Sequence, residues 1–474
     1  MNTFGSIIGG KERAGSNLLD VTNPYNGAVV GRVPLLSLDE VRKVLADSHA
    51  TTFKLSRYER AEILNKIADR IEADAEEVSL MITKEAGLSR KDTRYEVTRA
   101  ADVLRFAAMK ALDDDSEVFP CDVSKNGKQR RIYTTRVPLK LITAITPFNH
   151  PLNQVVHKVA PAIATNNATV LKPSEKTPLS AYYLGRIAIE CGLPAHMLNV
   201  ICTDSLNGTK ELVTNNLVSL VSFTGSSAIG KDIASRAGYK RLILELGGSS
   251  AFLILEDADI EEAVDITIAG IFKNSGQRCS SIRRILVHRS LADQYATRLT
   301  EKTREIVCAD PFDDASHMGC VIDETAATFI EKQVNDAVAR GAVVLCGNQR
   351  QGALYPPTVI DQVTNDMLLV ANETFGPVAP ILRFDTLDEA IEIANDTDYG
   401  LSGAVCSNHW PSIQRVISEL ETGTINVNEA PGYRLEWTPF GGIKDSGLGY
   451  KEGVIEAMKG MTTVKTYSLP WDTP

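Results

Sequence analysis

Apolar residues recur at helical spacing in the first quarter of the chain. Ile63, Ile67, Ile71, Val78 and Met81 stand three, four or seven positions apart, with charged residues between them. This spacing places the five side chains on one face of a helix, where they can pack against a core. The pattern predicts that residues 38–112 are mostly helical.

The pattern changes near residue 117. Residues 131–137 alternate in the manner of a β-strand, and residues 124–128 spell the turn signal Ser-Lys-Asn-Gly-Lys. An alternating run beside such a turn is typical of a β-hairpin. We therefore expect a hairpin within residues 117–138.

Beyond residue 140, short apolar runs alternate with helical segments. The runs lie at residues 141–145, 169–171, 199–201 and 217–223, and a second series lies at 251–255, 285–287 and 403–406. Regular alternation of strands and helices is typical of a parallel, doubly wound sheet. The sequence thus predicts an α/β fold with two parallel-sheet lobes and a ligand-binding cleft between them.

Composition narrows the class of protein. The chain has 474 residues, of which 43% are hydrophobic and 23% charged, so we expect two or three soluble domains. Its net charge of −10 argues against nucleic acid or an anionic membrane as the main partner, because both attract basic surfaces. The N-terminal segment lacks signal-peptide features, and no uncharged apolar stretch approaches the ~20 residues of a membrane helix. We therefore expect a cytoplasmic protein.

The eight cysteines are scattered without a CxxC pair, so we expect neither a disulfide framework nor a metal site. One of them, Cys279, differs from the rest because it follows Arg278 in the polar segment NSGQRCS at residues 274–280. A neighbouring arginine lowers the cost of forming the nucleophilic thiolate. Most single cysteines are small core residues, and that alternative stays open for Cys279 taken alone.

Six short motifs follow one another along the chain. They are TPFNHP at residues 146–151, KPSE at 172–175, LELGG at 244–248, GQRC at 276–279, NETFGPV at 372–378 and PFGGIKDSG at 439–447. In this order and spacing they resemble the NAD(P)-dependent aldehyde dehydrogenase family, of the hydrolytic, non-acylating kind. The resemblance covers essentially the whole chain.

The resemblance implies two doubly wound parallel-sheet lobes and a small β-stranded oligomerisation arm. The NAD-binding domain would comprise residues 1–116 and 139–246, and the catalytic domain residues 247–455. The arm would comprise residues 117–138 and 456–474. Because exposed strand edges are usually covered by a partner, we expect a homodimer or a homotetramer.

The resemblance assigns the chemistry to three residues. Cys279 would attack the aldehyde carbon, and the Asn149 amide with the Cys279 backbone N–H would stabilise the resulting oxyanion. After hydride transfer to the nicotinamide, Glu245 would be the general base on the water that hydrolyses the thioester. A CoA-acylating enzyme would not need Glu245, so its presence favours hydrolysis. Taken singly, Asn149 could cap a helix and Glu245 could form a surface ion pair.

The resemblance also implies NAD as the cofactor. Lys172 would bind the adenosine ribose, and Glu175 would accept hydrogen bonds from the ribose hydroxyls. A carboxylate at this position repels the 2′-phosphate of NADP, so NAD is favoured over NADP. The other residues implied to line the cofactor site are Thr146, Pro147, Phe148, Ser174, Gly208, Phe223, Ser226, Ile229, Leu246, Glu373 and Phe375.

Several cations occupy positions that resemble the substrate pocket of the family. Burying charges without partners is costly, so this cluster predicts an anionic group on the substrate. Arg99 could instead be a solvated helix residue, and His157 a buried core histidine. The residues implied to bind the substrate are Arg99, His150, Asn153, His157, Arg278, Ser280 and Arg434, with Gln154, Lys273 and Tyr433 beside them.

The segments at residues 149–153 and 433–434 resemble the phosphonoacetaldehyde and lactaldehyde dehydrogenase branch of the family. A dianionic phosphonate would account for so many cations, so we predict oxidation of phosphonoacetaldehyde to phosphonoacetate. Lactaldehyde, glyceraldehyde 3-phosphate, sulfonated aldehydes and succinate semialdehyde stay open as alternatives.

Overall fold

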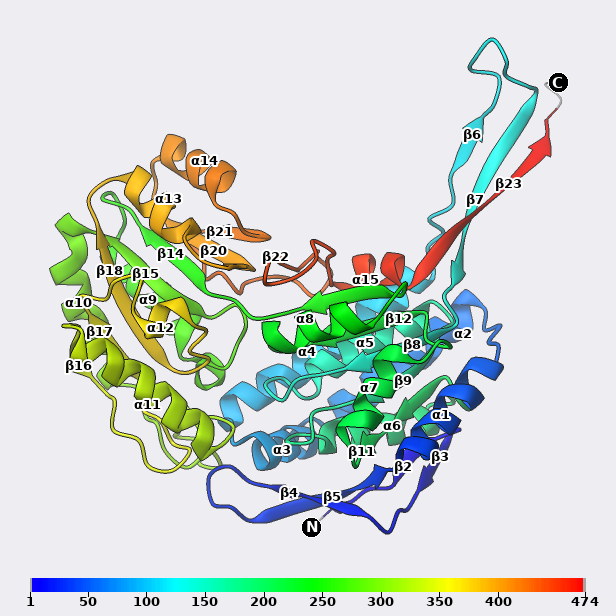
Figure 1. Cartoon of the computed structure of the whole chain (residues 1–474), viewed down its shortest axis with the longest axis horizontal. Helices are drawn as coiled ribbons and strands as arrows, with labels where there is room; N and C mark the ends of the chain where they lie inside the picture. Colours follow the sequence, from blue (N-terminus) through cyan, green and yellow to red (C-terminus); the bar gives the residue numbers. More distant parts are fainter. Residues whose placement is uncertain (1, 472–474) are drawn as a thin grey trace.

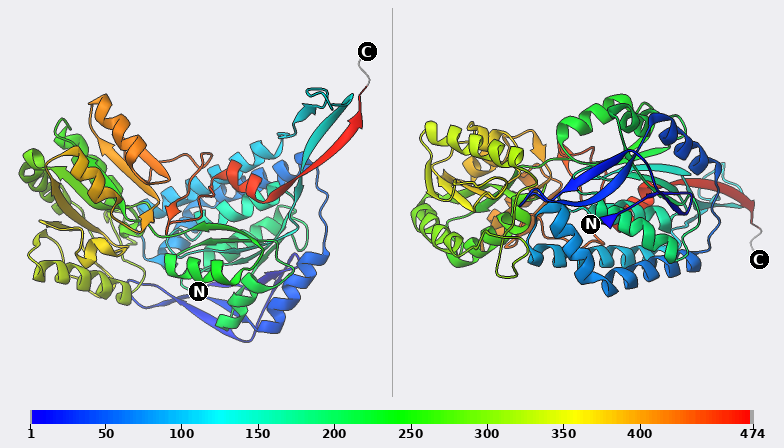
Figure 2. Two further views of the ribbon diagram at one scale, coloured as in Figure 1. Left: turned by 45° about the horizontal axis from the view of Figure 1, so that its top comes forward. Right: turned by 90° about the horizontal axis from the view of Figure 1, so that it is seen from below.

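The computed structural model of the protein describes residues 2–471. Two seven-stranded sheets form two lobes, and a three-stranded sheet extends from one of them as an arm (Figure 1). Figure 2 shows the same two lobes and the projecting arm from two further directions. The α/β fold with two parallel-sheet lobes is therefore confirmed. The domain boundaries that the sequence suggests stay a prediction.

The first sheet has the strand order β13-β12-β8-β9-β10-β2-β3. The strands from β13 to β10 are parallel, and β2 and β3 join antiparallel at the far edge. Strands such as β8 and β9 are buried along their whole length, as a parallel sheet covered on both faces requires. The strands are β2 (Ser6–Ile8), β3 (Lys11–Arg13), β8 (Leu141–Ile145), β9 (Ala168–Lys172), β10 (Leu198–Val200), β12 (Leu220–Thr224) and β13 (Arg241–Glu245).

The second sheet has the strand order β16-β17-β18-β15-β14-β20-β21. Strands β17 to β21 are parallel, and β16 joins antiparallel at one edge. The apolar runs predicted in this half of the chain lie in β14, β15 and β20. The strands are β14 (Ser250–Ile254), β15 (Ile282–His288), β16 (Val343–Cys346), β17 (Thr358–Asp361), β18 (Val378–Phe384), β20 (Ser402–Cys406) and β21 (Thr424–Val427).

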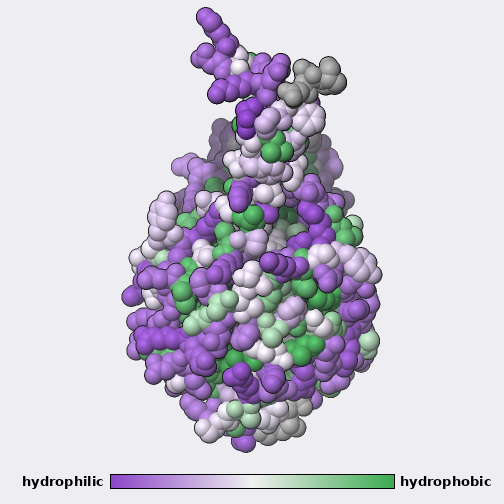
Figure 3. Space-filling model, turned by 90° about the vertical axis from the view of Figure 1, so that its right-hand side faces the viewer, coloured by the Kyte–Doolittle hydropathy of each residue, from purple (hydrophilic) through white to green (hydrophobic). Residues whose placement is uncertain are grey.

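The arm consists of the two strands of the predicted hairpin and of a third strand from the C-terminal part of the chain. Strand β7 (Arg130–Pro138) pairs antiparallel with β6 (Val118–Pro120) and with β23 (Thr462–Pro470). The predicted hairpin and terminal strand are confirmed, while residues 472–474 of the predicted arm lie outside the described residues. Figure 3, viewed from the side that bears the arm, shows hydrophilic residues at its tip and scattered hydrophobic residues along it.

The N-terminal residues form strands that the apolar pattern did not predict. Strand β5 (Val29–Leu36) pairs with β1 (Asn2–Thr3), β4 (Leu18–Thr22) and β11 (Cys202–Thr203). Strand β4 is mostly solvent-accessible, so its sequence carries no apolar run that would mark it. A short pairing between β19 (Tyr399–Gly400) and β22 (Ile443–Lys444) lies in the second half of the chain.

Residues 38–112 are mostly helical, as predicted, but they form four helices. Capping boxes at Ser37 and Ser56 begin the first two of them. The helices of the chain are α1 (Leu38–Ala50), α2 (Arg57–Ala73), α3 (Ala75–Ala86), α4 (Arg90–Ala111), α5 (Asn153–Ala164), α6 (Leu179–Glu190), α7 (Leu206–Thr214), α8 (Ser227–Arg236), α9 (Ile260–Ile271), α10 (Arg289–Arg304), α11 (Glu324–Ala339), α12 (Leu368–Ala371), α13 (Leu387–Asn395), α14 (Trp410–Glu419) and α15 (Val454–Gly460). Within residues 2–471, no helix is both long enough and apolar enough to span a membrane.

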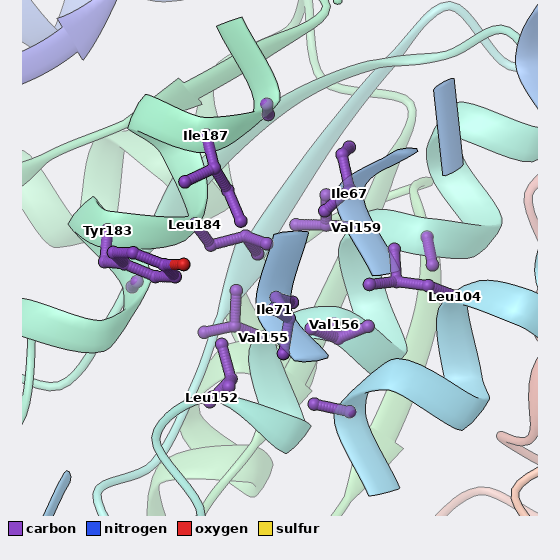
Figure 4. Packing of buried hydrophobic residues seen from close by; sticks show 14 of the residues in the cluster. Ile67, Ile71, Leu104, Leu152, Val155, Val156, Val159, Tyr183, Leu184 and Ile187 are labelled. Atoms are coloured by element: carbon purple, nitrogen blue, oxygen red, sulfur yellow. The ribbon is translucent and has the colours of Figure 1, made fainter. Parts of the chain in front are cut away.

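Helix α5 is enclosed on all sides, since every one of its residues is buried. Its valines at positions 155, 156 and 159 pack among apolar side chains from α2, α4 and α6, including Ile71, Leu104 and Leu184 (Figure 4). Close packing of this kind leaves a helix little freedom to shift. The loop that enters α5, residues 146–152, is held in place with it, and this loop carries Asn149.

Candidate active site

Cys279 follows a strained turn. One turn of 3-10 helix covers Lys273–Gly276, and within it Asn274 and Ser275 take left-handed backbone conformations with φ of 59° and 53°. Gly276 continues this conformation, and a Cβ there would lie 2.3 Å from the Gly376 carbonyl oxygen. Left-handed backbone is costly for residues other than glycine and persists where the surroundings hold it. The turn therefore sets where the thiol lies.

Contacts across the two lobes hold this turn against the loop before α5. The Asn274 side-chain amide donates to the Asn149 carbonyl at 2.8 Å, and the Asn149 amide donates to the Gln277 carbonyl at 2.7 Å. Helix α5 begins at Asn153 with Leu152 as its N-cap residue, so Asn149 does not cap it. The Asn149 amide is thereby fixed beside the backbone that leads to Cys279.

The Cys279 thiol is in a strongly desolvated environment. Burial, followed by the negative charge of Glu245, raises its pKa to about 12, although the positive charges of Arg434 and Arg278 act in the opposite direction. Arg278 therefore does lower the pKa of the thiol, as expected, but loss of hydration outweighs the attraction of the two guanidinium groups. The resting thiol is protonated at neutral pH.

Glu245 ends strand β13 and points into the interior. It is only 3% exposed, and neither carboxylate oxygen has a hydrogen-bond partner. Burial, with a further contribution from Glu452, raises the pKa of Glu245 well above its ordinary value. The alternative that Glu245 forms a surface ion pair is wrong. Nearby, Lys158 and Glu452 form a buried ion pair at 2.6 Å.

The predicted cofactor residues lie at the carboxyl ends of the strands of the first sheet. Lys172 ends β9 and pairs with Glu175, and Ser226 caps α8 by accepting from the Ile229 N–H at 3.5 Å. Two buried hydroxyls in this region, Thr146 Oγ1 and Thr224 Oγ1, have no hydrogen-bond partner. Dinucleotides bind at this edge of doubly wound sheets, and the unpartnered hydroxyls fit a polar ligand there. The predicted residues Pro147, Phe148, Ser174, Gly208, Phe223 and Leu246 lie in or next to the strands and helices of this lobe.

The second lobe contributes Glu373 and Phe375 to the set of predicted cofactor residues. Glu373 accepts a hydrogen bond from the Gly248 N–H at 3.1 Å, and the Phe375 ring meets the Phe148 ring edge-on with centroids 5.8 Å apart. Phe375 has a φ of 49°, a conformation that a bulky residue adopts only under constraint. The predicted cofactor residues thus come together from both lobes, and their set fits a dinucleotide. Within residues 2–471, no group of three or more His, Cys, Asp or Glu side chains is placed to hold a metal ion.

Two of the predicted arginines lie near the thiol. The Arg278 guanidinium donates from Nη2 to the carbonyl oxygens of Ala269 at 3.0 Å and Gly270 at 2.6 Å, while its buried Nε has no partner. The Arg434 guanidinium lies over the Phe440 ring at 3.6 Å from the centroid. The charge of each arginine lowers the pKa of Cys279.

A buried carboxylate that the sequence analysis missed pairs with the other cations. Glu436 is 5% exposed, and its two oxygens bind Arg99 Nε and His157 Nε2, the latter at 2.5 Å. Arg434 Nε lies 3.9 Å from the same carboxylate. The Arg99 side chain is 20% exposed, so the alternative of a solvated helix residue is wrong. The assumption that these cations have no partner is also wrong.

Two further acids hold the loop and the turn. Glu96 Oε1 accepts from the Leu152 and Asn153 N–H groups at 2.9 and 3.0 Å, and Glu96 Oε2 lies 3.7 Å from His150 Nδ1. Asp92 accepts from the Asn274 N–H at 2.9 Å. Of the remaining predicted substrate residues and their neighbours, Asn153, Gln154 and Ser280 are buried, and Lys273 and Tyr433 are exposed.

The sequence matches the profile of the aldehyde dehydrogenase family over residues 11–467. The chain belongs to the aldehyde dehydrogenase family. It is 36% identical over 462 residues to a 3-sulfolactaldehyde dehydrogenase of Priestia aryabhattai, and this alignment covers 97% of this chain and 96% of that protein. The resemblance drawn from the six motifs is therefore confirmed, and the aldehyde dehydrogenase oxidises small aldehydes.

Solved structures of aldehyde dehydrogenases also match the fold of this chain. Aldehyde dehydrogenase 21 from Physcomitrella patens, in complex with the reaction product succinate, matches with a TM-score of 0.96 and 32% identity, over 99% of this chain and 98% of that chain. The NADP-dependent glyceraldehyde-3-phosphate dehydrogenase from Bacillus halodurans, complexed with NADP, matches with a TM-score of 0.96 and 31% identity over 100% of both chains. Both proteins have the same fold as this aldehyde dehydrogenase.

One local signal could have revealed part of the missed acid set in this aldehyde dehydrogenase. Asp92, Glu96 and Arg99 stand four and three positions apart, on one face of α4, and all three turn toward the site. Two acids spaced this way beside an arginine predict a charged helix face that meets other charges. Glu436 has no such signal, because its partners lie hundreds of positions away in the sequence.

Proposed function

We propose that this aldehyde dehydrogenase oxidises a small anionic aldehyde to its carboxylate, with NAD as the hydride acceptor. The observation that carries this proposal is the position of two arginines: Arg278 directly precedes Cys279, and the Arg434 guanidinium lies over the Phe440 ring. The charges of both arginines also lower the pKa of the Cys279 thiol. The buried Arg278 Nε has no hydrogen-bond partner and keeps an unused donor for an anionic group. An arginine fork is suited to carboxylate, sulfonate and phosphonate groups.

The chain's own residues supply the acyl-transfer chemistry of this proposal. The Cys279 thiol gives its proton to solvent water and its sulfur attacks the aldehyde carbon, and the Asn149 amide with the Cys279 N–H stabilises the oxyanion. Loss of hydride from this adduct leaves a thioester on Cys279. NAD, when bound, supplies the acceptor for the hydride. Glu245 then takes a proton from the water that hydrolyses the thioester on Cys279, releasing the carboxylate. Burial raises the pKa of Glu245 well above its ordinary value, which makes the carboxylate a stronger base than an ordinary glutamate.

NAD rather than NADP is supported by Glu175. Its carboxylate pairs with Lys172 and stays partly exposed at the end of β9, where it would oppose a 2′-phosphate. The solved relative from Bacillus halodurans is complexed with NADP, so NADP is the alternative cofactor to test. The substitution E175Q should lower the ratio of kcat/KM with NAD to that with NADP by about tenfold. An unchanged ratio would remove Glu175 from this role.

Phosphonoacetaldehyde is the substrate that we propose first. Three arginines and two histidines surround the site, and a dianionic phosphonate would use more of them than a singly charged group. Monoanionic aldehydes, such as sulfonated aldehydes or succinate semialdehyde, are the second candidate. The pairing of Glu436 with Arg99 and His157 favours this second group, because it takes up part of the positive charge.

Initial rates of NADH formation test the proposal. Phosphonoacetaldehyde, a sulfonated aldehyde, succinate semialdehyde, glyceraldehyde 3-phosphate and lactaldehyde are compared, each with NAD and with NADP. A kcat/KM about tenfold higher for an anionic aldehyde, or about 1.4 kcal/mol of transition-state preference, would support the class. A flat profile, or a preference for neutral lactaldehyde, would mean that the cations are structural.

We also infer that the arm mediates assembly into a homodimer or homotetramer. Val118, Phe119, Tyr467 and Leu469 are exposed along β6 and β23, and such apolar strand surfaces are usually covered. The arm belongs to the proposed division into an NAD-binding domain, a catalytic domain and an oligomerisation arm. Sedimentation of the full chain, compared with a chain lacking residues 118–130, tests this role of the arm.

A further inference from the structure

Glu436 lies where three elements of the two lobes meet. It belongs to the segment between β21 and β22, whereas its partners Arg99 and His157 come from α4 and α5. Arg434, two residues before it, turns back toward the same carboxylate, with its Nε at 3.9 Å. One buried acid is therefore shared among three cations of the site.

The pairing divides the predicted substrate cations into two groups. Arg99 Nε and His157 Nε2 are hydrogen-bonded to Glu436, so those two atoms are not available to a substrate. Arg434 contacts the carboxylate at a longer distance, and its charge still acts on Cys279 and Glu245. Arg278 is bound to backbone carbonyls and keeps a buried, unpartnered Nε. Arg278 and Arg434 are the cations left to bind an anionic group.

We propose that Glu436 is a positioning residue that sets the charge preference of the substrate site. It binds Arg99 and His157 and offsets one positive charge of the site, so that each added negative charge on a substrate is bound less tightly than the arginines alone would allow. This inference rests on the proposed oxidation of an anionic aldehyde. It holds whichever anion is the better substrate, because it concerns how the rate changes with substrate charge.

Removing the carboxylate charge with E436Q tests this role, since glutamine keeps the shape of the side chain. A unit charge about 10 Å from another unit charge, at an effective dielectric constant near 20, changes a binding constant by about tenfold. In E436Q, kcat/KM should rise little for neutral propanal, by up to about tenfold for sulfoacetaldehyde, and by about a further tenfold for phosphonoacetaldehyde. The two anionic aldehydes are similar in shape, so their ratio isolates the charge.

Two matched variants distinguish the effect of the Glu436 charge from a structural effect of the substitution. E436D keeps the charge and should leave the ratio of phosphonoacetaldehyde to sulfoacetaldehyde rates within about twofold of wild type. E429Q removes an equal charge from an exposed position of the same segment, where water screens it, and should behave as wild type. An equal loss of rate for all three aldehydes in E436Q would overturn the proposal in favour of a merely structural role.

A second readout does not depend on the identity of the substrate. Iodoacetate and iodoacetamide alkylate the same thiol, but only iodoacetate carries a negative charge. Mass spectrometry of the peptide that contains Cys279 gives the ratio of the two alkylation rates. This ratio should rise by about tenfold in E436Q and stay unchanged in E429Q.

The two readouts distinguish failure of this inference from failure of the proposed function. If the wild-type enzyme prefers neutral aldehydes while the alkylation ratio still rises in E436Q, the proposed substrate class is wrong and Glu436 keeps its electrostatic role. If the wild-type enzyme prefers anionic aldehydes but neither ratio changes in E436Q, the inference about Glu436 is wrong and the proposed function stands.

Discussion

Two buried glutamates of the candidate site, Glu245 and Glu436, differ in almost everything except burial. Glu245 is 3% exposed and Glu436 is 5% exposed. Glu245 has no hydrogen-bond partner for either oxygen, and burial raises its pKa well above the ordinary range. Glu436 binds Arg99 and His157, and these cations hold its pKa well below the ordinary range. Burial alone therefore does not decide the state of a carboxylate.

The difference shows how one residue type serves two purposes in one site. A carboxylate without partners pays for its burial with a raised pKa, and it becomes a base that can take up a proton near neutral pH. A carboxylate paired with cations stays ionised and instead holds those cations in position. The roles that we propose, proton transfer for Glu245 and charge balance for Glu436, follow from the partners of each carboxylate and not from the residue type.

Both glutamates are proposed to act on a catalytic Cys279. The largest expected effect is therefore that of C279A. Loss of the nucleophile should lower kcat/KM by at least about 10⁴-fold, measured as NADH formation. C121A, which removes a thiol in the arm, is the matched control and should keep wild-type activity. Substantial activity in C279A would sink the mechanism as a whole.

E245Q tests the unpaired glutamate. Loss of the general base should lower kcat by about 10²–10⁴-fold. If hydride transfer precedes the lost step, rapid mixing should still show a burst of about one NADH per active site before the slow phase. A stopped-flow record without a burst would place Glu245 earlier in the reaction.

The same residue predicts a pH dependence. Glu245 must be deprotonated to act as a base, and its folded-state pKa is raised, so thioester hydrolysis should increase with pH up to a value well above that of an ordinary glutamate. The single-turnover hydrolysis rate of wild type should show this limb, and E245Q should lack it. A limb at the ordinary glutamate pKa would contradict the effect of burial.

The two glutamates should have opposite effects on the free energy of unfolding. The lowered pKa of Glu436 means that its ionised form contributes stability above about pH 4, and this contribution is lost as the pH falls through the folded-state pKa. E436Q should therefore reduce the free energy of unfolding at pH 7 by about 3 kcal/mol, because Arg99 and His157 lose their partner. The gap to wild type should narrow under acidic conditions.

Glu245 should behave in the opposite way. Its raised pKa means that the ionised form destabilises the fold at high pH, and this penalty disappears once the group is protonated. E245Q should leave the free energy of unfolding at pH 8 unchanged or raise it by about 1 kcal/mol. Urea titrations of both variants at pH 8 and pH 4 check the two signs, and equal losses in both variants would remove the distinction.

Arg434 sharpens the comparison, because its Nε lies 3.9 Å from Glu436 and its charge also acts on Glu245. R434A should raise KM for an anionic aldehyde by about tenfold and leave kcat nearly unchanged. KM for neutral propanal should change little. Equal losses with both aldehydes would show that Arg434 supports the fold and does not bind the anion.

Much of the fold could be predicted from local patterns. The apolar runs of β8, β14 and β20, and the helical spacing through α2 and α3, are buried elements whose side chains must follow the period of the secondary structure. Strand β4 was not predicted, because its residues are mostly exposed and carry no apolar run. Local patterns therefore mark an element only where that element is buried.

The electrostatics of the site could be predicted only in part. The sequence placed Arg278 beside Cys279 and suggested a thiolate, whereas burial raises the pKa of the thiol to about 12. Similarly, Arg99 has the position of a solvated helix residue, but its side chain is covered by the segment that carries Glu436. Hydration is lost through contacts with distant parts of the chain, and no short motif records them.

By itself, the sequence determined the family, the two parallel-sheet lobes and the candidate trio of Cys279, Asn149 and Glu245, because short motifs and periodic burial are local properties of the chain. Only the tertiary structure decided which charges are paired. Glu436 meets Arg99 across 337 positions and His157 across 279 positions. Coulomb interactions depend on distance in space and on the exclusion of water, and both are set only when the two lobes come together.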